Sequence, residues 1–279
     1  PAGLRLASCY FTQKGQPLIP PLEQCFENGF LARGEYNPGG TRHYQYCTAF
    51  PIGTMLAQSW NTCLLQEVGA AVGYEMALFG VSLWLAPGMN IHRSPLCGRN
   101  FEYFSEDPLL SGQMAAAITR GVQSCPGCGV TLKHFACNNQ ETERLESNSL
   151  VSERALREIY LRGFQIAVQS AQPSAIMTSY NLVNGVHAAN SAALCTAIAR
   201  CEWGFAGIFM TDWDTTSSRR CTAEGCIQAG NDLLMPGNRR EYSALLCALR
   251  DGRLDRRLLR SCAGRIIKTA LGLSAPTAP

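Results

Sequence analysis

Short apolar segments alternate with longer amphipathic segments from about residue 60 onward. The short segments are rich in β-branched and aromatic residues, a composition that favours strands. We expect strands at 81–86, 129–133, 175–180, 208–211 and 232–235, and a further strand at 22–26 that ends at Glu27.

The longer segments predict helices at 62–79, 109–124, 152–171, 191–203, 241–250 and 254–271. The pattern is clearest in the third, where Leu156, Ile159 and Phe164 share one face at helical spacing. Alternating strands and helices indicate a parallel sheet with right-handed crossovers. With about seven such units and no dinucleotide-binding fingerprint, an α/β fold of the (β/α)8 TIM-type barrel class is favoured over a doubly wound sheet.

The first part of the chain fits this pattern less well. It is rich in Gly, Pro and aromatic residues, so we expect a loop-rich start over 1–45 and a barrel that is irregular or incomplete at its N-terminal end. We predict one barrel domain over 1–272, followed by a linker-like tail at 273–279.

Composition narrows the function classes. The 279 residues are 46% hydrophobic and 16% charged, and the net charge of +3 comes from interspersed acids and bases. This balance argues against a nucleic-acid binder, and no run of 18 apolar residues predicts a membrane span. No signal peptide is visible in the chain as given, which favours a cytoplasmic location and leaves secretion open.

The chain contains 14 cysteines, many of them inside apolar runs. In a long, core-rich chain these predict mostly reduced thiols that pack as small hydrophobes. Cys125 and Cys128, followed by His134 and Cys137, have zinc-like spacing. No second ligand pair accompanies them, so we predict no metal and no cofactor.

Polar residues recur where the predicted strands end. Asp212 and Trp213 directly follow the strand at 208–211, and a charge at the end of a buried strand is costly unless it has partners or a function. In a parallel barrel the carboxyl ends of the strands form the active site. Together with Arg99, Lys133 and His134, these side chains predict a pocket for a polyhydroxylated ligand.

Four segments resemble the signature of glycoside hydrolase family 3, in its β-glucosidase branch. They run from Leu85 to Pro108 (LAPGMNIHRSPLCGRNFEYFSEDP), Lys133 to Glu141 (KHFACNNQE), Met177 to Gly185 (MTSYNLVNG) and Met210 to Trp213 (MTDW). The resemblance covers about residues 45 to 272, in order and with plausible spacing.

This resemblance implies a retaining β-glycosidase that hydrolyses terminal non-reducing β-D-glucosyl residues through a covalent intermediate on Asp212. The sugar-binding residues that it implies are Arg99, Lys133, His134, Tyr180, Trp213, Glu27 and Arg33. The last two rest on a weaker match, because the chain has Glu27-Asn-Gly where the family has an Asp-Gly-Pro-type turn.

The acid/base carboxylate has no clear match in the chain. In multi-domain members of the family it comes from a second α/β domain over the barrel mouth, and that domain is absent from this sequence. We therefore expect a second domain or another chain to supply it. A single-domain branch of the family, the β-N-acetylhexosaminidases, uses a histidine on the loop after its Lys-His motif, but this chain has no histidine between His134 and His187. The weaker alternative is a carboxylate on the corresponding loop, Glu141, Glu143 or Glu146.

Other functions stay open at this point. The same pocket suits a sugar-binding barrel without turnover, or a phosphorylase or transglycosidase that uses the same intermediate. Individual residues also have structural alternatives: Asp212 as a helix cap, Trp213 as core, Arg99 and Glu102 as an ion pair. The sugar is open as well, with glucose favoured by the resemblance.

Overall fold

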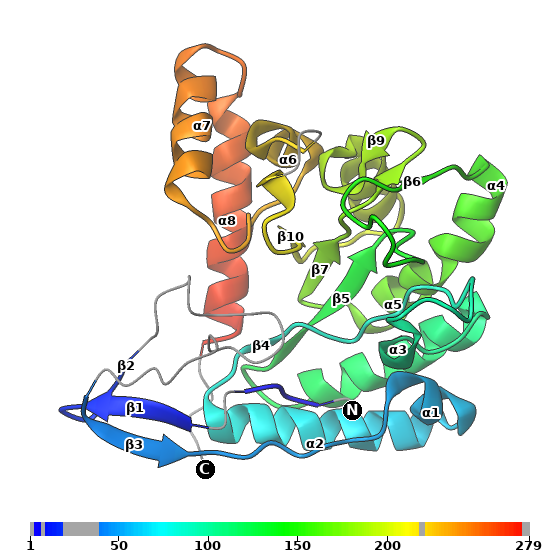
Figure 1. Ribbon diagram of the computed structural model, residues 1–279, viewed down its shortest axis with the longest axis vertical. Coiled ribbons are helices and arrows are strands. Elements are labelled where there is room, and N and C mark those ends of the chain that lie inside the picture. The colour runs from blue at the N-terminus through cyan, green and yellow to red at the C-terminus, as the bar shows by residue number, and fades with distance from the viewer. Residues whose placement is uncertain (1–2, 7–8, 19–38, 218–220, 275–279) are drawn as a thin grey trace. The chain divides into compact units, whose positions relative to one another are not determined.

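The computed structural model describes residues 3–6, 9–18, 39–217 and 221–274. The predicted strand at 22–26, the candidate residues Glu27 and Arg33, and 275–279 of the predicted tail lie outside the described residues. The chain divides into two compact units, Pro1–Phe50 and Pro51–Pro279. Each unit has a sheet of its own (Figure 1).

The first unit contains an antiparallel sheet in the order β2-β1-β3. Its strands are β1 (Cys9–Gln13), β2 (Gln16–Leu18) and β3 (Thr41–Tyr44). Lys14 and Gly15 both have positive φ, 52° and 76°, as a two-residue hairpin turn requires. Phe11 on the central strand is 3% exposed, and the Arg42 guanidinium lies 5.2 Å from its ring centroid. These three strands were not anticipated from the sequence, and the expectation of a loop-rich start over 1–45 stays a prediction.

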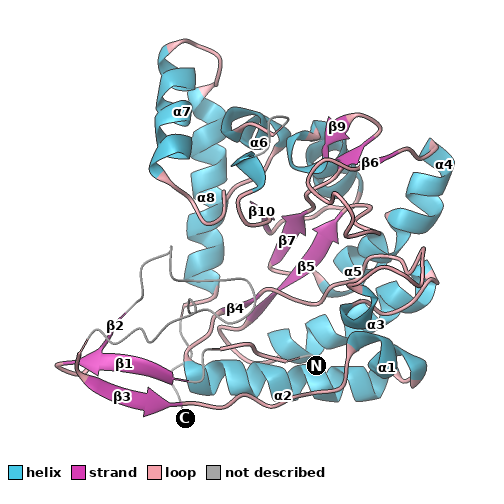
Figure 2. Cartoon of the chain, viewed as in Figure 1, coloured by secondary structure: helices cyan, strands magenta, loops and turns pink. Residues whose placement is uncertain are grey.

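The second unit contains a parallel sheet in the order β10-β7-β5-β4 (Figure 2). Its strands are β4 (Leu83–Trp84), β5 (Gly129–Phe135), β7 (Ala175–Thr178) and β10 (Ile208–Thr211). Every residue of β7 and β10 is buried, which explains their unbroken apolar sequences. The structure thus confirms an α/β fold with a parallel sheet.

Three long helices cover this unit: α2 (Thr62–Phe79), α3 (Pro108–Gln123) and α5 (Arg162–Ala171). Helix α3 packs against both α2 and α5. Glycines allow the α2–α3 contact, since a Cβ on Gly121 would lie 2.1 Å from the Gln66 carbonyl oxygen. Asp107 caps α3 by accepting from the backbone N–H groups of Leu109 and Leu110, as its position before Pro108 predicts.

Three further helices form a second cluster: α6 (Ala223–Ala229), α7 (Arg239–Arg250) and α8 (Arg256–Gly272). Ile227, Ala248, Leu254 and Cys262 form their buried contact. The short elements are α1 (Gly53–Gln58), η2 (Asn100–Glu102), α4 (Glu153–Ala155), η4 (Ala188–Asn190), η6 (Thr215–Ser217) and a small sheet of β6 (Asn148–Ser149), β8 (Leu182–Val183) and β9 (Val186–His187). Among the described residues, no helix has the length and apolar content needed to cross a membrane.

Four predicted elements differ in detail, the first being the strand at 81–86, of which only Leu83–Trp84 forms β4. The helix at 152–171 is interrupted by a π-helical segment, η3 (Leu156–Tyr160), and the helix at 191–203 is the π-helical η5 (Ala193–Glu202). The segment 232–235 forms one parallel bridge, Met210 to Leu233, rather than a continuous strand. Hydrophobic periodicity cannot distinguish these cases, because π and α helices have similar repeats and one bridge suffices to bury a short apolar run.

Candidate active site

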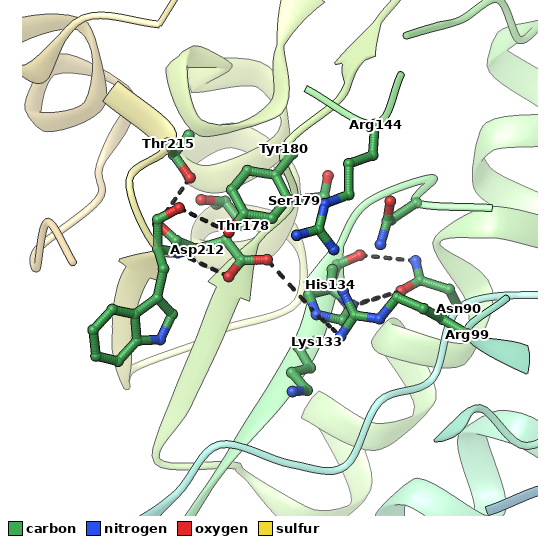
Figure 3. Close-up of polar contacts among 12 residues, drawn as sticks. Asn90, Arg99, Lys133, His134, Arg144, Thr178, Ser179, Tyr180, Asp212 and Thr215 are labelled. Carbon is green, nitrogen blue, oxygen red and sulfur yellow. Dashed lines mark hydrogen bonds and ion pairs between the residues drawn. The ribbon is translucent and has the colours of Figure 1, made fainter. Parts of the chain in front are cut away.

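Asp212 directly follows β10 and is 2% exposed. Its Oδ1 accepts a hydrogen bond from the backbone N–H of Trp213 at 2.8 Å, and its own carbonyl accepts from Thr215 Oγ1 at 2.8 Å. These contacts turn the chain sharply at the strand end and hold the carboxylate in place. Its other oxygen, Oδ2, lies toward β5 (Figure 3).

His134, near the end of β5, is the residue that Asp212 faces. Its Nε2 lies 3.7 Å from Asp212 Oδ2, and its side chain is 1% exposed. Burial lowers the pKa of His134 well below 6.5, and the positive charges of Arg99, Lys133 and Arg144 lower it further. The imidazole is therefore neutral at pH 7, so this close contact is not an ion pair.

Two neighbours determine which nitrogen of His134 carries the proton. Arg99 Nη2 lies 3.0 Å from Nε2, and a guanidinium can only donate, so Nε2 is an acceptor. Asn90 is oriented by the backbone of His134, accepting from its N–H at Oδ1 and donating from Nδ2 to its carbonyl, both at 2.8 Å. The same Oδ1 lies 3.4 Å from Nδ1, which is consistent with a proton on Nδ1.

A layer of polar side chains lies behind the imidazole. Tyr103 is buried, and its hydroxyl lies 3.2 Å from His134 Nδ1. Asn138 Nδ2 donates to the same hydroxyl at 3.2 Å. Burial raises the pKa of Tyr103 well above its usual value of 10, so the phenol keeps its proton. The imidazole is thus held at both ring nitrogens, by Arg99 at Nε2 and by Tyr103 at Nδ1.

Arg99 links His134 to Glu102. Its Nε donates to Glu102 Oε1, and Lys133 Nζ lies 4.0 Å from Glu102 Oε2. Burial acts to lower the pKa of Arg99, but Tyr103, Glu102 and Asp212 outweigh it, and the net change is upward. The sequence-based ion pair of Arg99 with Glu102 is present, and the same guanidinium also contacts the candidate site.

Tyr180 and Trp213 contact each other next to Asp212. The Tyr180 hydroxyl donates to the Trp213 carbonyl at 2.7 Å, and the Arg144 guanidinium stacks 4.9 Å from the Tyr180 ring centroid. Trp213 is half-buried and packs against a cluster that includes Met177 and Met210. Its indole therefore contributes to the core while one part stays accessible.

The loop carboxylates proposed as acid/base candidates occupy different settings. Glu141 accepts from Arg144 Nη1 at 3.0 Å, so it is engaged in an ion pair. Glu143 and Glu146 are exposed. The acid/base assignment among these three stays a prediction.

Four residues of the site were not singled out from sequence: Asn90, Tyr103, Asn138 and Arg144. The first two lie inside the quoted segment from Leu85 to Pro108, where their side chains point inward from turns that sequence cannot resolve. Arg144 stands among Glu141, Glu143 and Glu146, an alternation of charges that is typical of a solvated loop. Only its stacking on Tyr180 and the effect of its charge on the His134 pKa show that it belongs to the site.

The cysteines with zinc-like spacing do not converge on His134. Cys125 Sγ donates to the Ala70 carbonyl and Cys128 Sγ to the Gly73 carbonyl, so both thiols contact α2. Within the described part of the chain, no group of three or more His, Cys, Asp or Glu residues is placed to hold a metal ion. The thirteen described cysteines are not in disulfide bonds.

Comparison with known proteins places this geometry in a family. Residues 33–269 match the family described as "Glycosyl hydrolase family 3 N terminal domain". The chain belongs to glycosyl hydrolase family 3. The match covers the whole site described above, from Arg99 to Trp213, and includes the sheet on which it is built.

Individual relatives agree with this. The chain is 44% identical over 248 residues to a β-glucosidase of Ruminococcus albus, covering 85% of this chain and 26% of the relative. It is 47% identical over 207 residues to an exo-α-(1→6)-L-arabinopyranosidase of Bifidobacterium breve, covering 74% and 27%. The solved structure of β-glucosidase 3B from Thermotoga neapolitana in complex with glucose matches with a TM-score of 0.80 at 45% identity, covering 88% and 34%. The chain thus spans about a third or less of the length of these family members.

Proposed function

We propose that this chain is the nucleophile-bearing catalytic domain of a retaining β-glucosidase. Asp212 attacks the anomeric carbon of a terminal non-reducing β-D-glucosyl residue and forms a covalent glycosyl-enzyme, which water then hydrolyses. One observation carries the proposal: a buried carboxylate at the end of a parallel strand faces a neutral imidazole backed by an arginine. The names of relatives and the glucose complex of the Thermotoga structure support it.

The surrounding charges suit this chemistry. A nucleophilic carboxylate has to be ionised, and Arg99, Lys133 and Arg144 supply positive potential around the site. His134 is neutral, with Nε2 accepting from Arg99, so it has no proton at Nε2 to pass to Asp212. Arginine and lysine donors also match the hydroxyls of a pyranose ring, and the accessible part of Trp213 offers a flat apolar face.

The arrangement of the strands supports a more detailed proposal about the fold. We infer that the four parallel strands belong to a (β/α)8 barrel with Asp212 at its carboxyl-terminal rim. The parallel bridge of Met210 to Leu233 supports this, because it extends the sheet one position beyond β10. In such a barrel, residues after β5, β7 and β10 converge on one mouth.

The acid/base group is proposed to come from outside this chain. Retaining hydrolysis needs a second carboxyl group about 5–5.5 Å from the first. Glu141 is engaged by Arg144, and the chain covers only 26% of the Ruminococcus relative and 34% of the Thermotoga structure. A second domain or partner chain covering the mouth is the proposed source.

A mechanism-based trap tests the nucleophile without requiring the acid. An activated 2-fluoro-glucoside with a good leaving group needs little protonation to react, and the fluorine slows hydrolysis of the adduct. Intact-mass measurement is expected to find one added fluoroglucosyl group, mapped to Asp212, and none in Asp212→Ala. Asp214→Asn, two residues along the same loop, is the matched control and should label normally.

The outcomes separate the alternatives. Binding of glucose without any adduct would contradict the proposed chemistry and favour a sugar-binding barrel. A parallel reaction with the corresponding arabinopyranosyl analogue tests which sugar the site accepts. Both sugars are compared because one relative is named a β-glucosidase and another an arabinopyranosidase. Added phosphate or a sugar acceptor, with product analysis, distinguishes hydrolysis from transfer.

A further inference from the structure

Two cysteines meet at the start of α6, outside the site described above. Thr222 caps this helix, so Cys221 is the residue before the cap and Cys226 is the fourth residue of the helix. Side chains at these two positions face each other across the first turn, where apolar residues commonly pack as a staple. Here two thiols take that place, with their sulfur atoms 3.5 Å apart.

A polar neighbour holds both sulfurs in this arrangement. Asn190 Oδ1 lies 3.1 Å from Cys221 Sγ and 3.2 Å from Cys226 Sγ, within reach of a proton on either thiol. The pair is buried with Ala189 and against Leu234, so the two side chains have little room to move apart. Their separation is therefore set by packing and by a shared acceptor.

The two thiols differ in acidity. A hydrogen bond from Cys226 lowers the pKa of Cys221 to about 6, and His187 contributes in the same direction. The hydrogen bond with Cys221 and burial raise the pKa of Cys226. By contrast, burial raises the pKa of Cys137 and Cys195 to about 12, which makes them inert thiols.

We propose that Cys221 and Cys226 form an oxidation site for small hydroperoxides, in which Cys221 reacts first and Cys226 closes a disulfide. Burial of both sulfurs, at 2% and 0% exposure, restricts the oxidant to small molecules such as hydrogen peroxide. Sulfur contact at 3.5 Å requires only a short approach to reach the length of an S–S bond, about 2.05 Å.

The chemistry balances in two steps. The Cys221 thiolate attacks one peroxide oxygen, an S–O bond forms, the O–O bond breaks, and the leaving hydroxide takes up a proton as water. The Cys226 sulfur then attacks the Cys221 sulfenic acid, an S–S bond forms, the S–O bond breaks, and the thiol proton leaves with the hydroxyl as a second water. Two electrons pass from the two sulfurs to the peroxide.

The sequence provides a direct measurement on the intact chain. Trypsin releases residues 221–239 as one peptide whose only cysteines are Cys221 and Cys226, and residues 121–133 as one peptide whose only cysteines are Cys125 and Cys128. The folded chain is treated with graded hydrogen peroxide, alkylated, digested and weighed. A disulfide appears as an unalkylated peptide that lacks two hydrogens.

The second peptide is the matched control, because its thiols donate to two separate carbonyls of α2. We expect half-oxidation of 221–239 at a peroxide concentration at least about tenfold lower than for 121–133. Parallel oxidation of the two peptides, or earlier oxidation of 121–133, would overturn the proposal.

Single substitutions test the order of reaction. In Cys226→Ser, a 1,3-diketone probe should trap a sulfenic acid on Cys221, because no second thiol removes it. In Cys221→Ser, labelling of Cys226 should be at least about tenfold weaker. Equal labelling of the two variants would contradict the assigned roles. None of these measurements depends on glycosidase activity.

Discussion

The two buried aspartates beside β10 have opposite surroundings. The backbone N–H of Asp232 donates to the carbonyl of Phe209, near the start of β10, whereas Asp212 follows the last residue of β10. Asp232 accepts from Arg200 at 2.7 Å, Arg265 at 2.7 Å and the Phe209 N–H at 2.8 Å. The Asp212 carboxylate accepts from the Trp213 backbone N–H and faces a neutral imidazole.

This difference distinguishes a buried carboxylate that stabilises the fold, Asp232, from one that is proposed to react, Asp212. Two arginines enclose Asp232, so its charge is compensated and its oxygens are occupied by side chains that hold three elements together. The cations near Asp212 contact their own partners first, Arg99 through Glu102 and Arg144 through Glu141. These arginines supply positive electrostatic potential around Asp212, and its carboxylate keeps an orientation suited to reaction.

The largest expected effect comes from removing the charge of Asp212. Asp212→Asn keeps the shape and the contact with the Trp213 N–H, but loses the nucleophile. Adduct formation with the fluoroglucoside should fall by at least about 10³-fold. The free energy of unfolding in urea should fall by less than in Asp232→Asn, because the buried Arg99 keeps Glu102 as its counter-ion. If Asp212→Asn is as strongly destabilised as Asp232→Asn, the distinction between a reactive and a structural aspartate is contradicted.

Asp232→Asn should give the reverse result. It leaves Arg200 and Arg265 without their shared carboxylate, and the Arg200 side chain is only 13% exposed. The loss of stability should be about 3–5 kcal/mol, measured by urea unfolding. Asp251→Asn is the control, since its pair with Arg253 is exposed and should be worth under about 1 kcal/mol. Equal stability of the two variants would contradict the structural role of Asp232.

A smaller effect concerns the neutral His134. Because its folded pKa lies below 6.5, the unfolded chain takes up a proton first as pH falls, and stability is lost below about pH 6.5. Between pH 6.5 and 5 this residue should account for a loss of up to about 2 kcal/mol. The measurement is the difference in unfolding free energy between wild type and His134→Gln at each pH. Identical pH slopes would mean that folding does not lower the pKa of His134, and would contradict a buried neutral imidazole.

The smallest expected effect is that of Tyr103→Phe. It removes the hydroxyl that contacts His134 Nδ1 and Asn138, at a cost of about 1 kcal/mol in stability. Labelling of Asp212 should slow by about fivefold if the imidazole loses orientation. Nitrogen-15 chemical shifts of His134 report its tautomer directly. Tyr242→Phe, at a ring that is 66% exposed, should change neither quantity.

Much of the sheet was predictable from sequence. The strand at 208–211 and the helix at 62–79 have the bounds that periodicity predicts, because both are unbroken apolar or amphipathic runs with clear ends. Asn61 caps that helix by accepting from the Leu64 N–H. The hairpin of β1 and β2 was missed, since its strands are short and their pairing with β3 depends on residues about 30 positions away.

The sequence by itself determined which residues end the strands, and therefore that Asp212, His134 and Lys133 stand at one edge of a parallel sheet. It singled out Asp212 at the end of a strand, but it could not show which side chains surround Asp212 or Asp232. Tertiary structure decided those surroundings by bringing Arg200 and Arg265 to Asp232 and His134 to Asp212. Charge compensation depends on distances of a few ångströms between segments far apart in the chain, and local periodicity carries no information about them.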